Sequence, residues 1–342
     1  MRLPSIVSMF ALGVLPAQAP EPLRVCATTP DLGNLAAEVG GSAVTVTTFV
    51  TGPQDAHFLE ARPSMIRELN RADALVEVGL ELEIGWLPLL VDNARNGKVL
   101  PGSPGRIDAS TVIRKLEVPA GTFDRSSGDV HPGGNPHFCC DPLCGLRVAA
   151  LLRDRFTDLR PDGKQLFAAN YERFRERLCS AMVGPELAKL YHFDAEKLGV
   201  LYARGKLAAL LQAQGDLGRL GGWFGEMLPW RGAKVVADHD LWPYFADRFG
   251  ITVVGFFEPK PGIAPTTAHL EQLIKRMRTE QVRVILSAPY FAPQHAEFVA
   301  RTTGAKIAAM AHQVGSREGC DDYLAFVGHD VAAVVAALKG TQ

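Results

Sequence analysis

The feature that most constrains the fold is an alternation of short apolar segments with amphipathic helical segments, which occurs twice. In the first half, strand and helix candidates alternate at residues 23–28, 32–39, 43–50, 62–71, 74–79 and 85–94. The alternation restarts at residue 233, with candidates at 233–237, 243–249, 251–257, 267–279, 282–287, 294–303, 306–309 and 323–338. Strands that alternate with helices form parallel sheets covered by helices on both faces. We therefore expect an α/β fold of two lobes, each with a parallel sheet flanked by helices.

The length and the connecting segments set the expected domain organisation. A chain of 342 residues exceeds what a single hydrophobic core commonly supports. The expected parts are an N-terminal lobe at 20–160, a long linking helix at 161–183, a helical insertion at 184–228 and a C-terminal lobe at 229–342. Asp141-Pro142 predicts the capped start of a helix, and residues 102–136 are rich in turn-forming residues. Two lobes of this kind enclose a cleft, where ligand sites commonly form.

Residues 1–19 have the features of a secretory signal peptide. Arg2 provides a positive start, an apolar stretch runs from Ile6 to Leu15, and Ala17-Gln18-Ala19 matches an A-x-A cleavage pattern. The apolar stretch is too short to span a bilayer. We therefore expect an exported protein that works in the periplasm.

The charge balance excludes one class of partner. The chain has 36 basic and 37 acidic side chains and a formal net charge of −1. Nucleic-acid binding demands a basic surface, so no nucleic-acid partner is expected. The six cysteines include no CxxC pair, and their spacing leaves any disulfide connectivity open.

Three of the nine histidines lie where α/β proteins place ligand sites. His57 and His239 each follow a predicted strand, and His137 ends the glycine-rich loop HPGGNPH. Three imidazoles and a water make a tetrahedral zinc site, so these side chains are metal-ligand candidates. The alternative is that they are polar loop histidines bonded to the backbone. His131, in the same loop as His137, is either a fourth ligand or a side chain that stabilises the loop.

Several sequence blocks extend this interpretation. They are ATTPDLGNLAAEVGG (27–41), GPQDAHFLEARPS (52–64), ADALVEVGLELEIGWL (72–87), GDVHPGGNPHFCCDP (128–142), VVADHDLWPYFADRFG (235–250) and EPKPGIAPTTAHLEQLI (258–274). Through these blocks, above all GNPHFCCDP and HDLWPYF, the chain resembles the metal-binding solute-binding proteins of ABC importers, the zinc/manganese (ZnuA/TroA-like) group. The resemblance covers nearly the whole mature chain. It implies that His57, His137 and His239 are metal ligands in the cleft between lobes joined by a rigid helix.

The chain departs from the pattern of this family at the fourth ligand. Many relatives have a carboxylate on a late strand or the loop after it, but the corresponding segments read LSAPYF (286–291) and AAMAHQ (308–313). The loss of an oxygen ligand favours Zn²⁺ over Mn²⁺ or Fe²⁺. The candidates for the fourth position are water, His131, His312 and Glu258. The carboxylates expected to accept the other ring N–H of the ligating histidines are those of Glu60, Asp238 and Asp240.

The residues and the resemblance together predict an exported, monomeric protein that captures Zn²⁺ and performs no reaction of its own. The resemblance implies delivery of the ion to a membrane ABC permease with a cytoplasmic ATPase. A periplasmic metallochaperone is a further candidate partner.

Three alternative functions stay open. The first is a manganese- or iron-binding importer component. The second is a three-histidine zinc hydrolase, because three histidines and a water also form a catalytic site, although neither HExxH nor HxxEH occurs in the chain. The third is an importer component for an organic or chelated ligand, which would have an aromatic-lined pocket.

Overall fold

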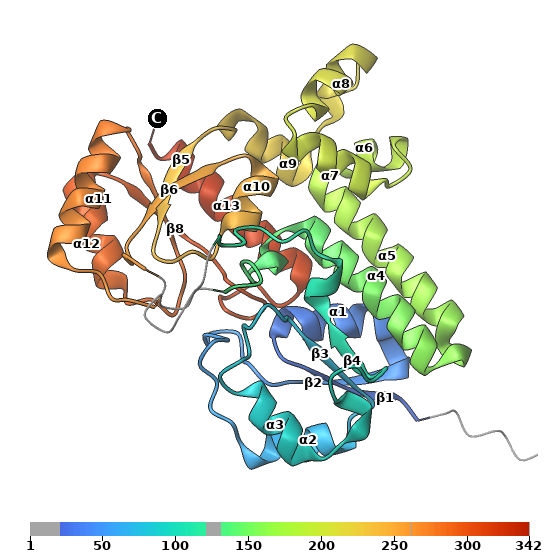
Figure 1. Ribbon diagram of the computed structural model, residues 1–342. Coiled ribbons are helices and arrows are strands. Elements are labelled where there is room, and N and C mark those ends of the chain that lie inside the picture. Colours follow the sequence, from blue (N-terminus) through green and yellow to red (C-terminus); the bar gives the residue numbers. More distant parts are fainter. Residues whose placement is uncertain (1–20, 121–130, 261, 342) are drawn as a thin grey trace, which may run out of the picture.

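The protein is built around two parallel four-stranded sheets (Figure 1). The structure, a computed structural model, describes residues 21–120, 131–260 and 262–341. The predicted α/β fold, with two parallel sheets flanked by helices, is confirmed. The predicted signal peptide at residues 1–19 lies outside the described residues. We call the parts around the two sheets the N-terminal and C-terminal lobes, and the lobe boundaries stay a prediction.

The first sheet has the strand order β2-β1-β3-β4. Its strands are β1 (Leu23–Ala27), β2 (Val44–Thr48), β3 (Ala74–Glu77) and β4 (Arg106–Asp108). The helices between them are α1 (Pro30–Gly40), α2 (Pro63–Arg71) and α3 (Leu87–Ala94). Helix α2 packs on α3 at one face of the sheet, whereas α1 covers the other (Figure 1).

Strand β4 lies in the turn-rich stretch, where no strand was predicted. Of its three residues, only Ile107 is apolar, so the segment has no period-2 pattern to recognise. The strand forms because it pairs in parallel with β3. Arg106 supports this pairing from Nε and Nη2, which lie 2.6 and 2.5 Å from the two carboxylate oxygens of Glu77.

The second sheet repeats the topology of the first, with the order β6-β5-β7-β8. Its strands are β5 (Lys234–Ala237), β6 (Thr252–Phe256), β7 (Val284–Ser287) and β8 (Lys306–Ala309). The helices of this half are α10 (Pro243–Phe249), α11 (Thr267–Thr279), α12 (Pro293–Thr303) and α13 (Tyr323–Lys339). In both sheets the first strand is internal and the second is at the edge. The order in which strands are added to each sheet therefore reverses beside β1 and β5. Open α/β sheets bind their ligands at such reversals.

Two long helices run along the N-terminal lobe. Helix α4 (Pro142–Leu159) begins as predicted, because Asp141 Oδ1 accepts a hydrogen bond from Leu143 N at 2.9 Å. Helix α5 (Lys164–Val183) follows and packs on α1 and α4. The short helices after it are α6 (Pro185–Leu190), α7 (Ala195–Ala203), α8 (Leu207–Gln214) and α9 (Gly222–Met227).

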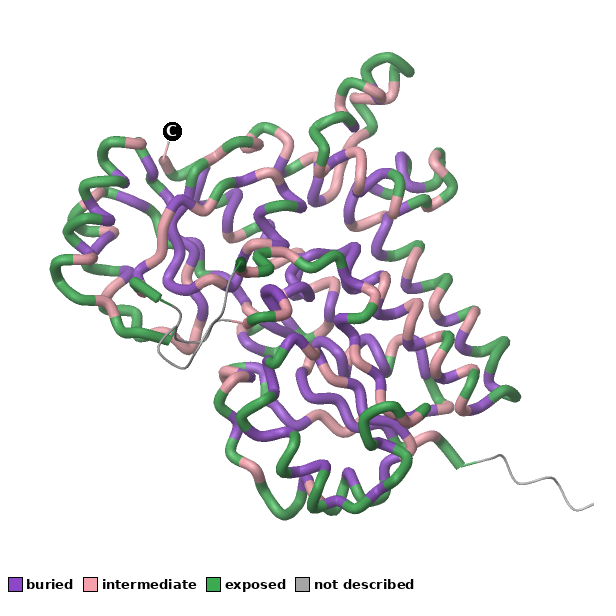
Figure 2. The backbone as a smooth tube through the Cα atoms, viewed as in Figure 1, coloured by how far each residue is buried: buried purple, intermediate pink, exposed green. Residues whose placement is uncertain are grey.

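Buried residues concentrate on the sheets and on the helix faces against them (Figure 2). All six cysteines are buried and form no disulfide, and Cys26 is a core residue of β1, as expected from its apolar surroundings. Among the described helices, none has the length and apolarity needed to cross a membrane.

Candidate metal-binding site

The loop after β2 carries His57 and sets the direction of its ring. Asp55 Oδ1 accepts a hydrogen bond from His57 N at 2.9 Å and lies 2.8 Å from His57 Nδ1. Burial raises the pKa of Asp55, but the hydrogen bonds and charge of His57 outweigh it, so the net pKa lies below the usual value. The Asp55 carboxylate therefore engages Nδ1 and leaves Nε2 as the outward nitrogen of the ring.

His239 is held in the same way from the C-terminal lobe. His239 follows β5. Its Nδ1 lies 2.5 Å from Oε2 of Glu258, and Glu258 is two residues beyond the end of β6. Asp238 fixes the backbone instead, because Oδ1 accepts from His239 N at 2.9 Å and Oδ2 accepts from Ala288 N at 2.7 Å. Burial raises the pKa of Asp238 to about 7.

His131 and His137 complete a cluster of four imidazoles with His57 and His239. The His131 and His57 Nε2 atoms lie 3.1 Å apart, and their ring centroids are 5.2 Å apart. The His137 ring lies 5.3 Å from that of His57 and 6.2 Å from that of His239, and 6.3 Å separates the rings of His57 and His239. Side chains that are far apart in the sequence and come from both lobes thus meet at one place.

Burial keeps two of these imidazoles neutral. Burial, followed by the charge of His57, lowers the pKa of His131 to about 4. The same two effects lower the pKa of His137 well below its usual value. Neutral imidazoles have a free lone pair at neutral pH, which is the form that binds a metal.

The spacing of the cluster can be compared with a tetrahedral site. With Zn–N distances of about 2.0–2.1 Å, two ligating nitrogens lie roughly 3.3 Å apart. The 3.1 Å between the His57 and His131 Nε2 atoms is close to this value. Within residues 21–120, 131–260 and 262–341, however, no group of three or more His, Cys, Asp or Glu side chains already has the geometry for holding a metal ion. Binding a cation would therefore require some of the rings to turn.

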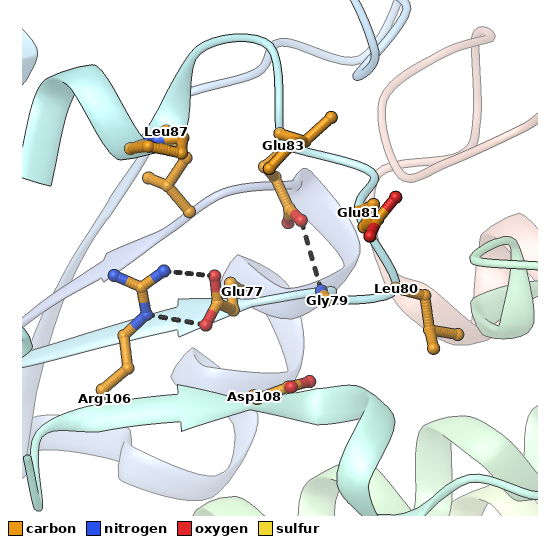
Figure 3. Close-up of a pocket in the computed structure, with 10 residues that line it drawn as sticks. Glu77, Gly79, Leu80, Glu81, Glu83, Leu87, Arg106 and Asp108 are labelled. Atoms are coloured by element: carbon orange, nitrogen blue, oxygen red, sulfur yellow. Dashed lines mark hydrogen bonds and ion pairs between the residues drawn. The ribbon is translucent and has the colours of Figure 1, made fainter. Parts of the chain in front are cut away.

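An acidic pocket lies at the carboxyl end of β3 (Figure 3). Its volume is about 240 Å³, and its carboxylates include those of Glu77 and Glu83. Arg106 pairs with Glu77, and Glu83 accepts hydrogen bonds from Thr28 and from the backbone at Val78 and Gly79. These two carboxylates are already engaged. The pocket meets the histidine cluster at Leu80, whose backbone forms a hydrogen bond with His131. Leu80 lies in a turn in which Gly79, Leu80 and Glu81 all have positive φ.

The sequence of the chain matches the family model described as zinc-uptake complex component A, periplasmic (ZnuA), over residues 25–181 and 210–337. These segments make up most of the chain. The protein belongs to this zinc-uptake family. Members of the family are metal-binding solute-binding proteins of ABC importers and not enzymes, which argues against the hydrolase alternative.

Relatives that are about 20% identical to this chain are named for two different metals, zinc and manganese. The chain is 22% identical to the high-affinity zinc uptake system protein ZnuA of Yersinia pestis, over 80% of this chain and 78% of that protein. It is 20% identical to the manganese-binding lipoprotein MntA of Halalkalibacterium halodurans, over 93% of this chain and 89% of that protein. The metal of this member is therefore left open by its relatives.

Solved structures of periplasmic metal-binding proteins share the fold. The match to a crystal structure of ZnuA covers 93% of this chain and 99% of the ZnuA chain, with a TM-score of 0.66 and 19% sequence identity. The match to the Mn-bound periplasmic metal binding protein of Candidatus Liberibacter asiaticus covers 92% of this chain and 98% of that chain, with a TM-score of 0.64 and 17% sequence identity.

The carboxylates on the ring nitrogens of His57 and His239 differ from all three that were predicted, because Asp238 accepts hydrogen bonds from the backbone and not from an imidazole. Glu60 is exposed, and Asp240 interacts with Glu117, whose pKa is raised to about 7 by burial and by the charge of Asp240. Asp55 and Glu258 take these places. Asp55 could have been found from the sequence, because an aspartate two residues before His57 forms a local turn. Glu258 was singled out from the sequence only as a candidate metal ligand, and its contact with the His239 ring depends on the pairing of β5 with β6.

His312, a candidate fourth ligand, lies at the edge of this region. Its Nε2 is 3.1 Å from the Gln54 carbonyl, and burial lowers its pKa to about 4. With His137 and Asp55 it lines a cavity of about 30 Å³. Glu258, another candidate, is engaged by His239.

Proposed function

We propose that this protein captures Zn²⁺ outside the cytoplasm and delivers it to an ABC permease driven by a cytoplasmic ATPase. The observation that carries the proposal is the meeting of four histidine rings from both lobes, with neighbouring ring centroids 5.2–6.3 Å apart. Membership of the zinc-uptake family supports the transport role.

We assign the ligand positions to His57, His137 and His239, with His131 as the fourth ligand. The separation of 3.1 Å between the His131 and His57 Nε2 atoms supports His131 over His312, whose Nε2 contacts the Gln54 carbonyl. The carboxylates of Asp55 and Glu258 orient two of the rings through Nδ1, as carboxylates commonly do for metal-bound histidines.

The ligand set favours zinc over manganese or iron. Imidazole nitrogens suit Zn²⁺, whereas Mn²⁺ prefers carboxylate and water oxygens. The carboxylates of Asp55 and Glu258 contact ring nitrogens of this cluster, where they orient histidines. Manganese is the second candidate, because one relative is named as a manganese-binding lipoprotein.

Metal analysis of the purified mature chain, followed by competition against a chelator of known affinity, tests this function. We expect about one Zn²⁺ per chain and weaker binding of Mn²⁺ and Fe²⁺. Alanine at His57, His137 or His239 should weaken zinc binding by orders of magnitude, and His131→Ala by less. His295→Ala, in α12, is the matched control. Unchanged affinity in all four cluster variants would refute the site.

The cellular part of the proposal needs a separate test. We propose that residues 1–19 direct export to the periplasm and that the mature chain works as a monomer. A metallochaperone is a further candidate partner. Fractionation of cells that express the full chain, together with zinc-limited growth of a strain lacking it, would measure location and role. Retention in the cytoplasm would contradict the export prediction.

A further inference from the structure

The loop that carries His57 is held by the opposite lobe. Gln313, which follows β8, is 3% exposed. Its Nε2 donates to the carbonyls of Gln54 at 2.8 Å, Gly52 at 2.9 Å and Thr51 at 3.2 Å. Because all three partners are acceptors, the nitrogen end of the amide must face the loop.

The neighbours of Gln313 reinforce this contact. His312 Nε2 lies 3.1 Å from the same Gln54 carbonyl, and Val314 N donates to Asp31 Oδ1 at 2.7 Å. Gly315 has a φ of +72° and packs on Gly52 so closely that a Cβ on Gly52 would lie 2.1 Å from its backbone. Residues 312–315 therefore contact the N-terminal lobe both at the loop that carries His57 and at Asp31 in α1, and we call them the 312–315 segment.

Hydrogen bonds inside the loop fix its conformation but not its position relative to the C-terminal lobe. Gln54 N donates to the Thr51 carbonyl at 2.9 Å, and Gln54 Oε1 accepts from Thr51 N at 2.9 Å. Asp55 then turns the ring of His57. These bonds would survive a movement of the whole loop. The bonds from Gln313 would not, because Gln313 belongs to the lobe that also carries His239.

We propose that Gln313 is a positioning residue for metal binding, which sets the distance between His57 and the histidine of the opposite lobe. The inference rests on the proposed function. Gln313 acts through the loop backbone and not on the cation. Buried carbonyls that lose their donor carry a large desolvation cost, so the loop would move to regain hydrogen bonds from water. His57 would move with it and leave the position at which it meets the other rings.

Three variants of the full mature chain test the inference. Gln313→Ala removes the donor, and Gln313→Glu keeps the shape but offers only acceptors to three carbonyls. The matched control is Asn34→Ala, which removes another interlobe hydrogen bond, from Tyr323 N to Asn34 Oδ1 at 3.0 Å. Zinc affinity by chelator competition, thermal unfolding without metal, and amide hydrogen exchange of residues 51–57 are measured for each.

We expect both Gln313 variants to bind Zn²⁺ at least about tenfold more weakly than wild type, with faster exchange in the loop. Asn34→Ala should show lower thermal stability with wild-type affinity, which separates positioning from general destabilisation. Zinc affinity that is unchanged in both Gln313 variants but lost in His57→Ala overturns this inference and leaves the proposed function intact. A wild-type chain that binds no zinc overturns both.

Discussion

Nδ1 of His239 and Oε2 of Glu258 lie 2.5 Å apart, although 19 residues separate them in the sequence. The carboxylate also accepts from Gly262 N at 2.9 Å, and its side chain is 11% exposed. A buried carboxylate in this position fixes the ring and increases the basicity of its other nitrogen. Under the proposed function, Glu258 is therefore a positioning residue of the metal site and not a ligand of the cation.

Removal of Glu258 should weaken metal binding selectively. We expect Glu258→Ala to reduce zinc affinity about 10- to 100-fold, the range found for carboxylates behind metal-bound histidines. Glu60→Ala, at the exposed residue first predicted for this role, is the control and should bind like wild type. Isothermal titration with Zn²⁺ measures both variants. The opposite order of affinities would show that Glu60 orients the ring.

The buried Asp31 should make stability depend on pH. It accepts from Val314 N at 2.7 Å, and burial raises its pKa to about 7 against the opposing effect of that bond. A carboxyl whose pKa is raised on folding holds its proton more tightly in the folded state. Its contribution to stability is therefore fully present below the unfolded pKa of about 4 and is lost as the pH rises through about 7.

Asp31→Asn keeps an acceptor for Val314 and removes the charge. We expect the free energy of unfolding of this variant to exceed that of wild type by about 1 to 4 kcal/mol at pH 8 and to match it near pH 4. Urea unfolding of the metal-free protein at pH 4, 6 and 8 measures the difference. A difference that does not change with pH would contradict the raised pKa.

The ion pair of Arg248 with Asp141 should matter far more than an exposed pair of the same type. Arg248 Nε and Nη2 donate to the two carboxylate oxygens at 2.7 and 2.8 Å, and both side chains are nearly buried. Arg248→Ala leaves a buried charge unpaired, which should lower the free energy of unfolding by about 3–5 kcal/mol. The exposed pair between Arg114 and Asp247 is the control, and Arg114→Ala should cost about 1 kcal/mol or less. Equal losses in denaturant unfolding would mean that burial does not control this ion pair.

Gly52 should be intolerant of a side chain. A Cβ there would lie 2.1 Å from the backbone of Gly315, and neither backbone can yield without moving the His57 loop. We expect Gly52→Ala to lower the free energy of unfolding by about 1–3 kcal/mol and to weaken zinc binding as well. Gly97→Ala, where a Cβ meets nothing within 4 Å, is the matched control. Thermal unfolding and zinc titration of the two variants give the comparison.

Local signals in the chain predicted much of the fold. Asp141-Pro142 predicted the start of α4, because an N-cap side chain and a proline at the first position act within four residues. The period of the apolar residues predicted the strands from β1 to β3. Strand β4 was missed because its residues Arg106 and Asp108 are charged, and its stability comes from the pairing with β3.

In the candidate site, too, some features follow from local sequence and others depend on the tertiary structure. The positions of His57 and His239 after strands are a local property, and so is the turn that brings Asp55 to His57. The proximity of His131 to His57 is not, because 74 residues separate them and their 3.1 Å contact depends on how loops from different strands pack.

The sequence by itself determined the two α/β halves, the family and the set of histidines worth testing, since these depend on periodicity, short motifs and residue type. Only the tertiary structure decided that Glu258, and not Glu60, Asp238 or Asp240, contacts the His239 ring, and that Gln313 holds the loop of His57. The physical reason is that hydrogen bonds act over about 3 Å, whereas the residues they join here are 19 and 259 positions apart in the chain. Such distances are set by the order of strands in the two sheets and the packing of the lobes, which no local pattern encodes.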